Sequence, residues 1–222
     1  MTIYFKSTRT DGTDFYTGSV DYAAALTSGE PLPELPGDVQ FPGPGWYHLA
    51  TVPTECVGMS WPCRLFEVEP VGDVFMDNAH PRKIGSRSVR VLREIEAHHV
   101  FGPQGEQVAA LIERCRTLSV AGLDRLAATW YATRGSVPGV ARGSASAAAS
   151  AADRHVALTV ARYAAGDAGD AAVALLCRDL IGQHDGWDQD AYDRLTGPWR
   201  DVIGPIHPDD LVRRTLEGDS DE

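Results

Sequence analysis

The sequence predicts an α+β protein, in which an N-terminal antiparallel or mixed β-rich module precedes an α-helical bundle. Over residues 1–96, β-branched and aromatic residues cluster in short runs between prolines and glycines, a pattern typical of strands. From residue 97 onward, apolar residues recur at helical spacing instead. Hydrophobic residues make up 43% of the 222 residues, which is enough to build a core. We therefore expect a β-rich module over 1–96, a helical bundle over 97–210 and an acidic tail over 211–222.

The N-terminal segment predicts a hairpin followed by a short helix. Thr2–Ser7 and Phe15–Thr17 have the composition of strands, and the turn formers Asp11–Gly12 lie between them. Asp21 is a suitable N-cap for a helix over Tyr22–Leu26, because its carboxylate can accept a hydrogen bond from a first-turn amide.

Residues 29–45 predict a long loop. Five prolines and four glycines between Gly29 and Trp46 exclude regular secondary structure there. A loop of this length in a compact domain is usually functional or mobile. We interpret it as a candidate lid or binding loop over the sheet, and the alternative is a surface insertion without such a role.

The central strands of the β-rich module are predicted over Gly45–Thr51, Cys63–Glu69, Val71–Met76 and Ser88–Ile95. Pro70 and Gly72 separate the second run from the third, because neither residue favours the interior of a strand. Pro53 fits the first turn of a short helical segment after the first run. Asp77–Pro81 has the composition of a turn.

In the second half, apolar residues at spacings of three and four predict helices around Val108–Cys115, Leu123–Tyr131, Ala152–Ala165, Asp170–Ile181 and Tyr192–Leu195. The Ser-, Gly- and Ala-rich segment 135–152 predicts a loop that passes into a helix near Ser150. Asp188 is a suitable N-cap for the last helix, and Gly197–Pro198 should interrupt it.

Composition excludes several classes of partner. The chain carries 31 acidic and 20 basic residues, a net charge of −11, which disfavours nucleic acid as a partner. Residues 1–20 lack a signal peptide pattern, and no run approaches the roughly 18 apolar residues of a membrane span. The four cysteines form no Cys-x-x-Cys pair, so a zinc or redox motif is not supported. A short loop offers oxygen and imidazole ligands for a metal ion, but turn formation explains these residues equally well and no metal is expected: Asp73, Asp77, Asn78 and His80. We expect a cytoplasmic protein without a membrane partner.

Three segments carry a resemblance to a known family. Gly45-Trp-Tyr-His-Leu-Ala-Thr-Val-Pro, Cys63-Arg-Leu-Phe-Glu-Val-Glu and Ser88-Val-Arg-Val-Leu-Arg-Glu-Ile resemble an uncharacterised domain family of bacteriophage and prophage proteins. His48 matches that family's histidine and Pro53 its proline. The resemblance covers roughly residues 1–100 and implies a fold module and a phage setting, because the family has no assigned activity.

The second half is similar to the Ala-rich helical tails of uncharacterised actinobacterial and actinophage proteins. The matching segments are Asp179-Leu-Ile-Gly-Gln-His and Leu195-Thr-Gly-Pro-Trp-Arg. This similarity implies a phage-encoded or phage-derived protein in the cytoplasm of an actinobacterial host.

These observations favour a non-enzymatic accessory protein that acts by protein–protein interaction. The expected partner is a host protein or a second copy of the chain, bound through the acidic surface or the Pro/Gly-rich loop. Neither a cofactor nor a metal ion is expected under this hypothesis. A homo-oligomer is one form that such binding would take.

The alternative is an NAD-using enzyme, because the strand runs of the first half also resemble some ADP-ribosyltransferase-like folds. This resemblance implies a cleft around four candidate catalytic residues, Tyr4, Lys6, His48 and Glu67. The chain departs from the pattern, since its first strand lacks a histidine and no diagnostic Glu-x-Glu lies on a catalytic loop. His48 itself has two open interpretations, a proton acceptor near pH 7 or a ring bonded to a backbone carbonyl or carboxylate.

Overall fold

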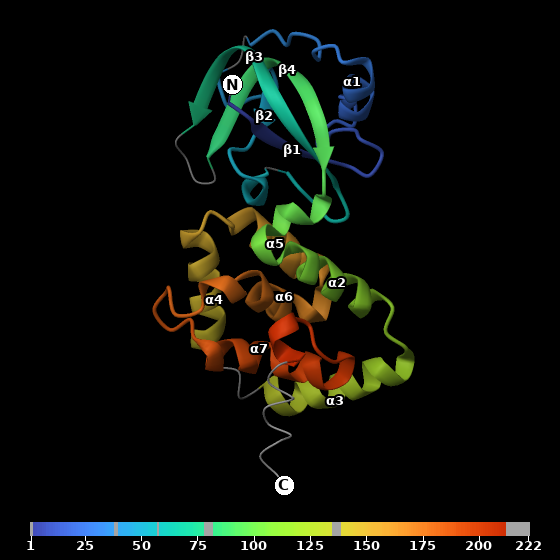
Figure 1. Cartoon of the computed structure of the whole chain (residues 1–222), viewed down its shortest axis with the longest axis vertical. Helices are drawn as coiled ribbons and strands as arrows, with labels where there is room; N and C mark the ends of the chain where they lie inside the picture. The colour runs from blue at the N-terminus through green and yellow to red at the C-terminus, as the bar shows by residue number, and fades with distance from the viewer. Residues whose placement is uncertain (1, 38–39, 57, 78–81, 135–138, 212–222) are drawn as a thin grey trace. The chain divides into compact units, whose positions relative to one another are not determined.

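The computed structural model describes residues 2–37, 40–56, 58–77, 82–134 and 139–211. It confirms the α+β class, with an N-terminal antiparallel sheet followed by helices (Figure 1). Residue contacts divide the chain into two compact units, of which the first comprises residues 1–102 with 153–160 and the second residues 103–152 with 161–222. Apart from Leu211, the predicted acidic tail lies outside the described residues.

The sheet of the first unit has four antiparallel strands in the order β1-β3-β4-β2. The strands are β1 (Tyr4–Thr8), β2 (Tyr47–Leu49), β3 (Arg64–Asp77) and β4 (Lys83–Ile95). The two outer strands, β1 and β2, also meet, because the amides of Phe5 and Ala50 each donate to the other residue's carbonyl at 2.9 Å. The sheet is therefore curled until its edges touch at one end (Figure 1).

One face of this sheet carries the hydrophobic core. Its buried residues include Tyr4, Tyr47, Leu49, Phe66, Val68, Ile84, Val89 and Val91. Helix α1 (Tyr22–Ser28) packs on this face, and its Tyr22 ring stacks on Phe66 with centroids 6.3 Å apart. The Asp21 carboxylate accepts from the Ala24 amide, as predicted. Gly29 ends the helix in the left-handed conformation.

The predicted strand over Phe15–Thr17 is wrong, because the side chain of Asp14 organises this segment as a turn. Its two carboxylate oxygens accept hydrogen bonds from the Thr17 amide and hydroxyl, both at 2.7 Å, and from the Val20 amide at 3.0 Å. A buried carboxylate that bonds several amides outcompetes strand pairing for the same backbone groups. β1 and α1 are thus joined by a fixed turn.

The Pro/Gly-rich segment has no regular secondary structure where it is described, but its first half is anchored to the sheet. The amides of Leu32 and Leu35 donate to the carbonyls of Val89 and Arg87 at 2.8 and 2.7 Å. β2 pairs with residues 84–86 of β4. The Leu32–Leu35 segment bonds to the next residues along the same edge of β4. Residues 32–35 are therefore part of the sheet's border.

β3 joins two runs that the sequence predicted as separate strands. A bulge between Val71 and Val74 accommodates Gly72, which has a positive φ of 87°, so pairing with β4 resumes after it. The 3₁₀ turn η1 (Pro53–Glu55) confirms the predicted helical turn. Within the first unit, η1 holds the segment 153–160, because Thr54 Oγ1 donates to the Asp153 carbonyl at 2.8 Å and Glu55 accepts from the Val156 amide at 3.3 Å.

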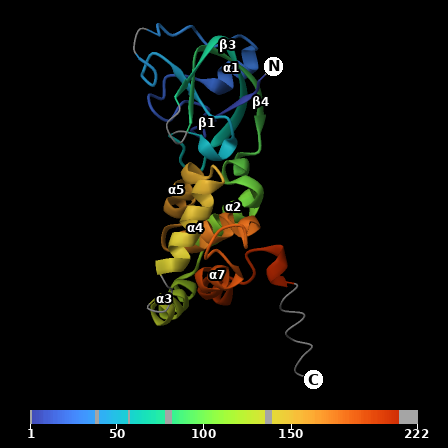
Figure 2. The ribbon, with the colours of Figure 1, turned by 90° about the vertical axis from the view of Figure 1, so that its left-hand side faces the viewer.

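The described helices after the sheet are α2 (Gly105–Arg116), α3 (Val120–Arg134), α4 (Gly139–Ala151), α5 (His155–Ala164), α6 (Gly169–Leu176) and α7 (Gln189–Ile203), preceded by the 3₁₀ segment η2 (Ala97–Gln104). In the second unit α6 is central and contacts α2, α4 and α7 (Figure 2). All but one of its residues are buried, which matches an apolar sequence that has no polar face.

Three helix boundaries differ from the prediction. α4 already runs over Gly139–Ala151, where a loop as far as Ser150 was expected, because its alanines pack into the core. α6 ends at Leu176 and is followed by a 3₁₀ turn, whereas the sequence predicted helix as far as Ile181. α7 continues through Pro198, since the buried side chains on both sides of the proline hold the helix together.

The Asp14 turn makes the stability of the first unit depend on pH. Burial alone would raise the pKa of Asp14, but hydrogen bonds from Thr17 and Val20 lower it to about 2. The ionised carboxylate therefore stabilises the fold above about pH 4, and this contribution, of roughly 2 kcal/mol, is lost as the pH falls towards 2. We expect Asp14→Asn to flatten the dependence of the unfolding free energy on pH in this range, measured by urea denaturation.

The control for this prediction is Asp185→Asn, which removes the same charge at an exposed position of the second unit. This variant should keep the acid-dependent loss of stability. If the unfolding free energy falls equally steeply with pH in the parent and in Asp14→Asn, another group causes the acid sensitivity.

Candidate functional site

The structure does not bring Tyr4, Lys6, His48 and Glu67 into one cleft. Lys6 pairs with Phe66 in the β1–β3 register, so its side chain lies on the core face together with Tyr4. Glu67 is the next residue of β3 and lies on the opposite face. His48 pairs with Gly85, between the core residues of β2, and also lies on that opposite face.

Lys6 ties the two outer strands together. Its Nζ donates to the His48 carbonyl at 3.3 Å and lies 5.7 Å from the centroid of the Tyr22 ring. Burial lowers the pKa of Lys6 below its ordinary value. Tyr4 is only 9% exposed on the same face. These contacts give Lys6 a structural role where β1 and β2 meet.

Glu67 is held in a bidentate ion pair with Arg93 of β4. The two guanidinium nitrogens lie 2.7 and 2.8 Å from the carboxylate oxygens. The hydrogen bonds from Arg93 lower the pKa of Glu67. The carboxylate is therefore ionised and fully engaged across two neighbouring strands, which is the arrangement of a cross-strand pair.

The second interpretation of His48 matches the geometry, because the ring has a backbone partner. Its Nε2 lies 3.0 Å from the Gly43 carbonyl. Burial lowers the pKa of His48, so the neutral ring donates this hydrogen bond near pH 7. Gly43 belongs to the Pro/Gly-rich segment, and His48 thus fixes the end of that loop over the sheet.

An aromatic layer covers this face of the sheet, formed by Phe41, Trp46, His48 and Phe75. The Phe41 ring lies 5.5 Å from His48 and 6.0 Å from Trp46, and Trp46 lies 4.4 Å from Phe75. Gly85 of β4 lies beneath it, because a Cβ there would be only 2.5 Å from Phe41 Cε2. The layer joins the Pro/Gly-rich loop to β2 and β3.

The candidate functional surface is the β3 arm, which we define as Val71–Asp77. β1 pairs with β3 only as far as Val68, and no strand among the described residues pairs with the same edge beyond it. Every residue of the arm except Asp77 is exposed. Four of them are large and apolar: Val71 (41% exposed), Val74 (43%), Phe75 (40%) and Met76 (51%).

The arm combines two properties that soluble proteins usually avoid. Its outer edge presents backbone amides and carbonyls that another strand can pair with. Its side chains form an exposed apolar stretch, since Val74 pairs with Ser86 and Met76 with Ile84 on one face while Phe75 lies on the other. The inner part of Phe75 packs on the buried ring of Trp46, so the arm is supported from behind.

Sequence reasoning predicted a strand over Val71–Met76 but not its exposure. The available signal was the lack of alternation, because apolar residues occur at adjacent positions Val74, Phe75 and Met76 next to Gly72 and Asp73. Such a pattern fits a strand with neither face fully buried. That no described strand pairs with the outer edge could not be predicted, since strand pairing depends on distant segments.

Comparisons with known proteins give no family for the chain: no family model, curated protein or solved structure matches it significantly. No helix within the described ranges has the length and apolar character needed to cross a bilayer. No group of three or more His, Cys, Asp or Glu side chains in those ranges is placed to hold a metal ion.

The aromatic layer yields a stability prediction. Gly85→Ala places a methyl group against the Phe41 ring and forces it off the sheet, which should destabilise the first unit by roughly 1–3 kcal/mol. The double variant Gly85→Ala with Phe41→Leu should recover part of this loss, because the smaller side chain leaves room for the methyl group. Equilibrium urea unfolding of these two variants and of Phe41→Leu alone measures the coupling energy between positions 41 and 85. A Gly85→Ala variant as stable as the parent would contradict the close contact.

Proposed function

We propose that the chain acts by protein–protein interaction and that the β3 arm is its binding surface. Two features occur together over Val71–Asp77, and they carry the proposal. No described strand pairs with the outer edge, and four large apolar side chains are exposed. An extended segment of a partner would add a strand to this edge. Main-chain hydrogen bonds would give affinity, and contacts with Val74 and Met76 would give specificity.

Scattered exposed apolar residues are normal and need no explanation. The arm differs because three of its four large apolar residues, Val74–Met76, are adjacent in sequence and lie on a strand that is fixed on its other side by β4 and, through Phe75, by Trp46. A surface that is already ordered before binding loses little conformational entropy when a partner binds. These features support a binding role over a purely structural one.

Charge favours a partner other than a second copy. The chain has a net charge of −11, and Asp73 adds an exposed carboxylate within the arm. Two copies repel each other through their net charge, whereas an extended segment with lysine or arginine is attracted. We therefore propose a basic partner segment, and self-association is the competing outcome of the test.

The resemblance of residues 45–53, 63–69 and 88–95 to a phage and prophage domain family supports an accessory role in a bacterial cell. In that setting the partner is a host protein, bound in the cytoplasm. We do not extend the proposal to an NAD-using enzyme, because Lys6 and Glu67 lie on opposite faces and Arg93 occupies both oxygens of Glu67.

The proposal predicts that a charge on the arm abolishes binding without unfolding the protein. Val74→Lys places an ammonium group at an exposed strand position, where lysine is the natural deterrent to edge pairing. In affinity capture from actinobacterial lysate, the parent should retain a specific protein and Val74→Lys should lose it. Hydrogen exchange at Val71–Asp77 should slow in the complex, because new backbone hydrogen bonds protect these amides.

The matched control is Val140→Lys, the same change at a 71% exposed valine of α4. It should bind as the parent does. Equal capture by both lysine variants, or unchanged exchange of the arm in the complex, would show that binding occurs elsewhere. Sedimentation velocity of the purified parent reports self-association. If the parent is a dimer and Val74→Lys dissociates it, the partner of the arm is a second copy of the chain rather than a basic segment of another protein.

A further inference from the structure

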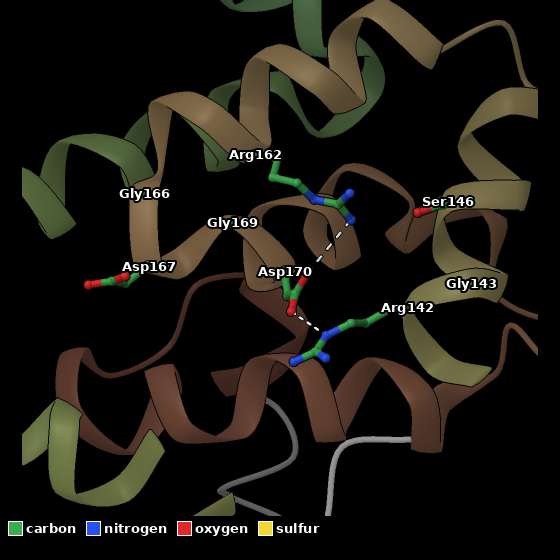
Figure 3. Close-up of a pocket in the computed structure, with 8 residues that line it drawn as sticks. All are labelled: Arg142, Gly143, Ser146, Arg162, Gly166, Asp167, Gly169 and Asp170. Atoms are coloured by element: carbon green, nitrogen blue, oxygen red, sulfur yellow. Dashed lines mark hydrogen bonds and ion pairs between the residues drawn. The ribbon is translucent and has the colours of Figure 1, made fainter. Parts of the chain in front are cut away.

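The second unit contains a pocket that the proposed binding role does not use. It has a volume of about 590 Å³ and lies where α4 faces the end of α5, the 3₁₀ turn η3 (Gly166–Ala168) and the start of α6 (Figure 3). Volumes of this size are typical of small-molecule sites in proteins. All of its lining residues belong to the second unit.

Two arginines in the pocket converge on one carboxylate. Arg142 of α4 donates through Nε to Asp170 Oδ2, and Arg162 Nη2 of α5 lies 3.7 Å from Asp170 Oδ1 (Figure 3). Asp167 also lines the pocket, but its exposed carboxylate points away from both guanidinium groups (Figure 3). The converging side chains therefore carry a net charge of about +1, in a chain whose total is strongly negative.

The arginines have more hydrogen-bond donors than Asp170 can accept. Each guanidinium has five N–H groups in a planar fork, and Asp170 engages only one side of each. Arg162 Nε is buried and has no hydrogen-bond acceptor among the described residues. Ser146 lies one turn after Arg142 on α4 and directs its hydroxyl towards the same space (Figure 3). The two guanidinium groups and the Ser146 hydroxyl therefore include donors that Asp170 does not use.

Two glycines leave the backbone around the pocket open. A Cβ at Gly143 or Gly166 would meet no atom within 4 Å, so nothing in the described structure fills the space above them. Gly169 is different, because a Cβ there would be 2.8 Å from the Arg162 carbonyl oxygen, and its role is close packing of α6 on α5. The first turn of α6 has no side-chain N-cap, and its amides add positive potential on the same side.

We propose that this pocket binds the phosphate group of a small molecule, with Arg142, Arg162 and Ser146 as donors and Asp170 as the residue that positions both guanidinium groups. A tetrahedral dianion can accept from two arginines in different planes and from a hydroxyl at once. Inorganic phosphate and a phosphorylated metabolite share this chemistry. The inference is independent of the β3 arm, which lies in the other unit.

The test is a titration of the full chain with inorganic phosphate at constant ionic strength, with chloride as the balancing anion. We expect saturable NMR shifts of the Gly143 and Gly166 amides and of the Arg142 and Arg162 Nε–H signals. Arg162→Gln should weaken binding by roughly tenfold or more, because a charge-assisted bidentate partner is lost. Arg162→Lys keeps the charge but lacks the planar fork, so its affinity for phosphate should lie between those of Arg162→Gln and the parent.

Gly143→Glu gives a variant whose folding is not at risk, since the position is exposed, helical and free of neighbours within 4 Å. Its carboxylate enters the pocket and should abolish phosphate binding by repulsion. Gly197→Glu is the matched control, because it adds the same charge at a helical glycine of α7 that has no neighbour within 4 Å and does not line the pocket, so it should bind as the parent does. Arg194→Gln removes the same charge as Arg162→Gln from an exposed Arg194–Asp190 pair and should leave binding unchanged.

A parallel titration with ribose 5-phosphate separates the two sources of the ligand. Tighter binding than inorganic phosphate supports a phosphorylated metabolite, and equal or weaker binding supports the free ion. Two results would overturn the proposal: chloride reproduces the NMR shifts at the same ionic strength, or the shifts persist in Gly143→Glu and Arg162→Gln. The cluster would then be only an ion-pair network between α4, α5 and α6.

Discussion

The architecture of the first unit depends on a mismatch in strand length. β3 has 14 residues, whereas its outer neighbour β1 has only five. Where β1 is present, the sheet curls until Phe5 and Ala50 pair through two backbone hydrogen bonds. Beyond Val68 the same strand continues without an outer neighbour among the described residues. One end of the sheet is therefore closed, and the other forms the exposed arm.

The closed end accounts for the contacts of its polar residues. Once the strands curl, Lys6 has the core on one side and the His48 carbonyl within reach, and Glu67 faces Arg93 on the adjacent strand. A buried charge without a partner costs several kcal/mol, and the bond from Lys6 Nζ to the His48 carbonyl and the pair of Glu67 with Arg93 offset that cost. Lys6 and Glu67 are residue types that often take part in catalysis, but here their contacts connect neighbouring strands of the sheet.

Local signals predicted those parts of the fold whose stabilising contacts are local. Asp21 and Gly29 mark the two ends of α1 because capping involves only the helix and its flanking residues. The strands were predicted from their own composition, which is also a local property. Pro198 was misjudged because distant packing on the buried face of α7 outweighs its local cost. The candidate surface was only half predictable. The strand was evident from composition, but which part of its outer edge lacks a described neighbour depends on where β1 begins, at Tyr4 opposite Val68.

Glycine shows why the sites themselves could not be read from the sequence. Gly85 and Gly169 are required because a Cβ would collide with Phe41 or with the Arg162 carbonyl, so these positions are closed by packing. Gly143 and Gly166 have no neighbour within 4 Å, and their missing side chains leave the pocket open beside two arginines. The residue type is the same in both cases. Only the surrounding atoms distinguish a glycine that allows close packing from one that keeps space for a ligand, and those atoms come from segments far apart in the chain.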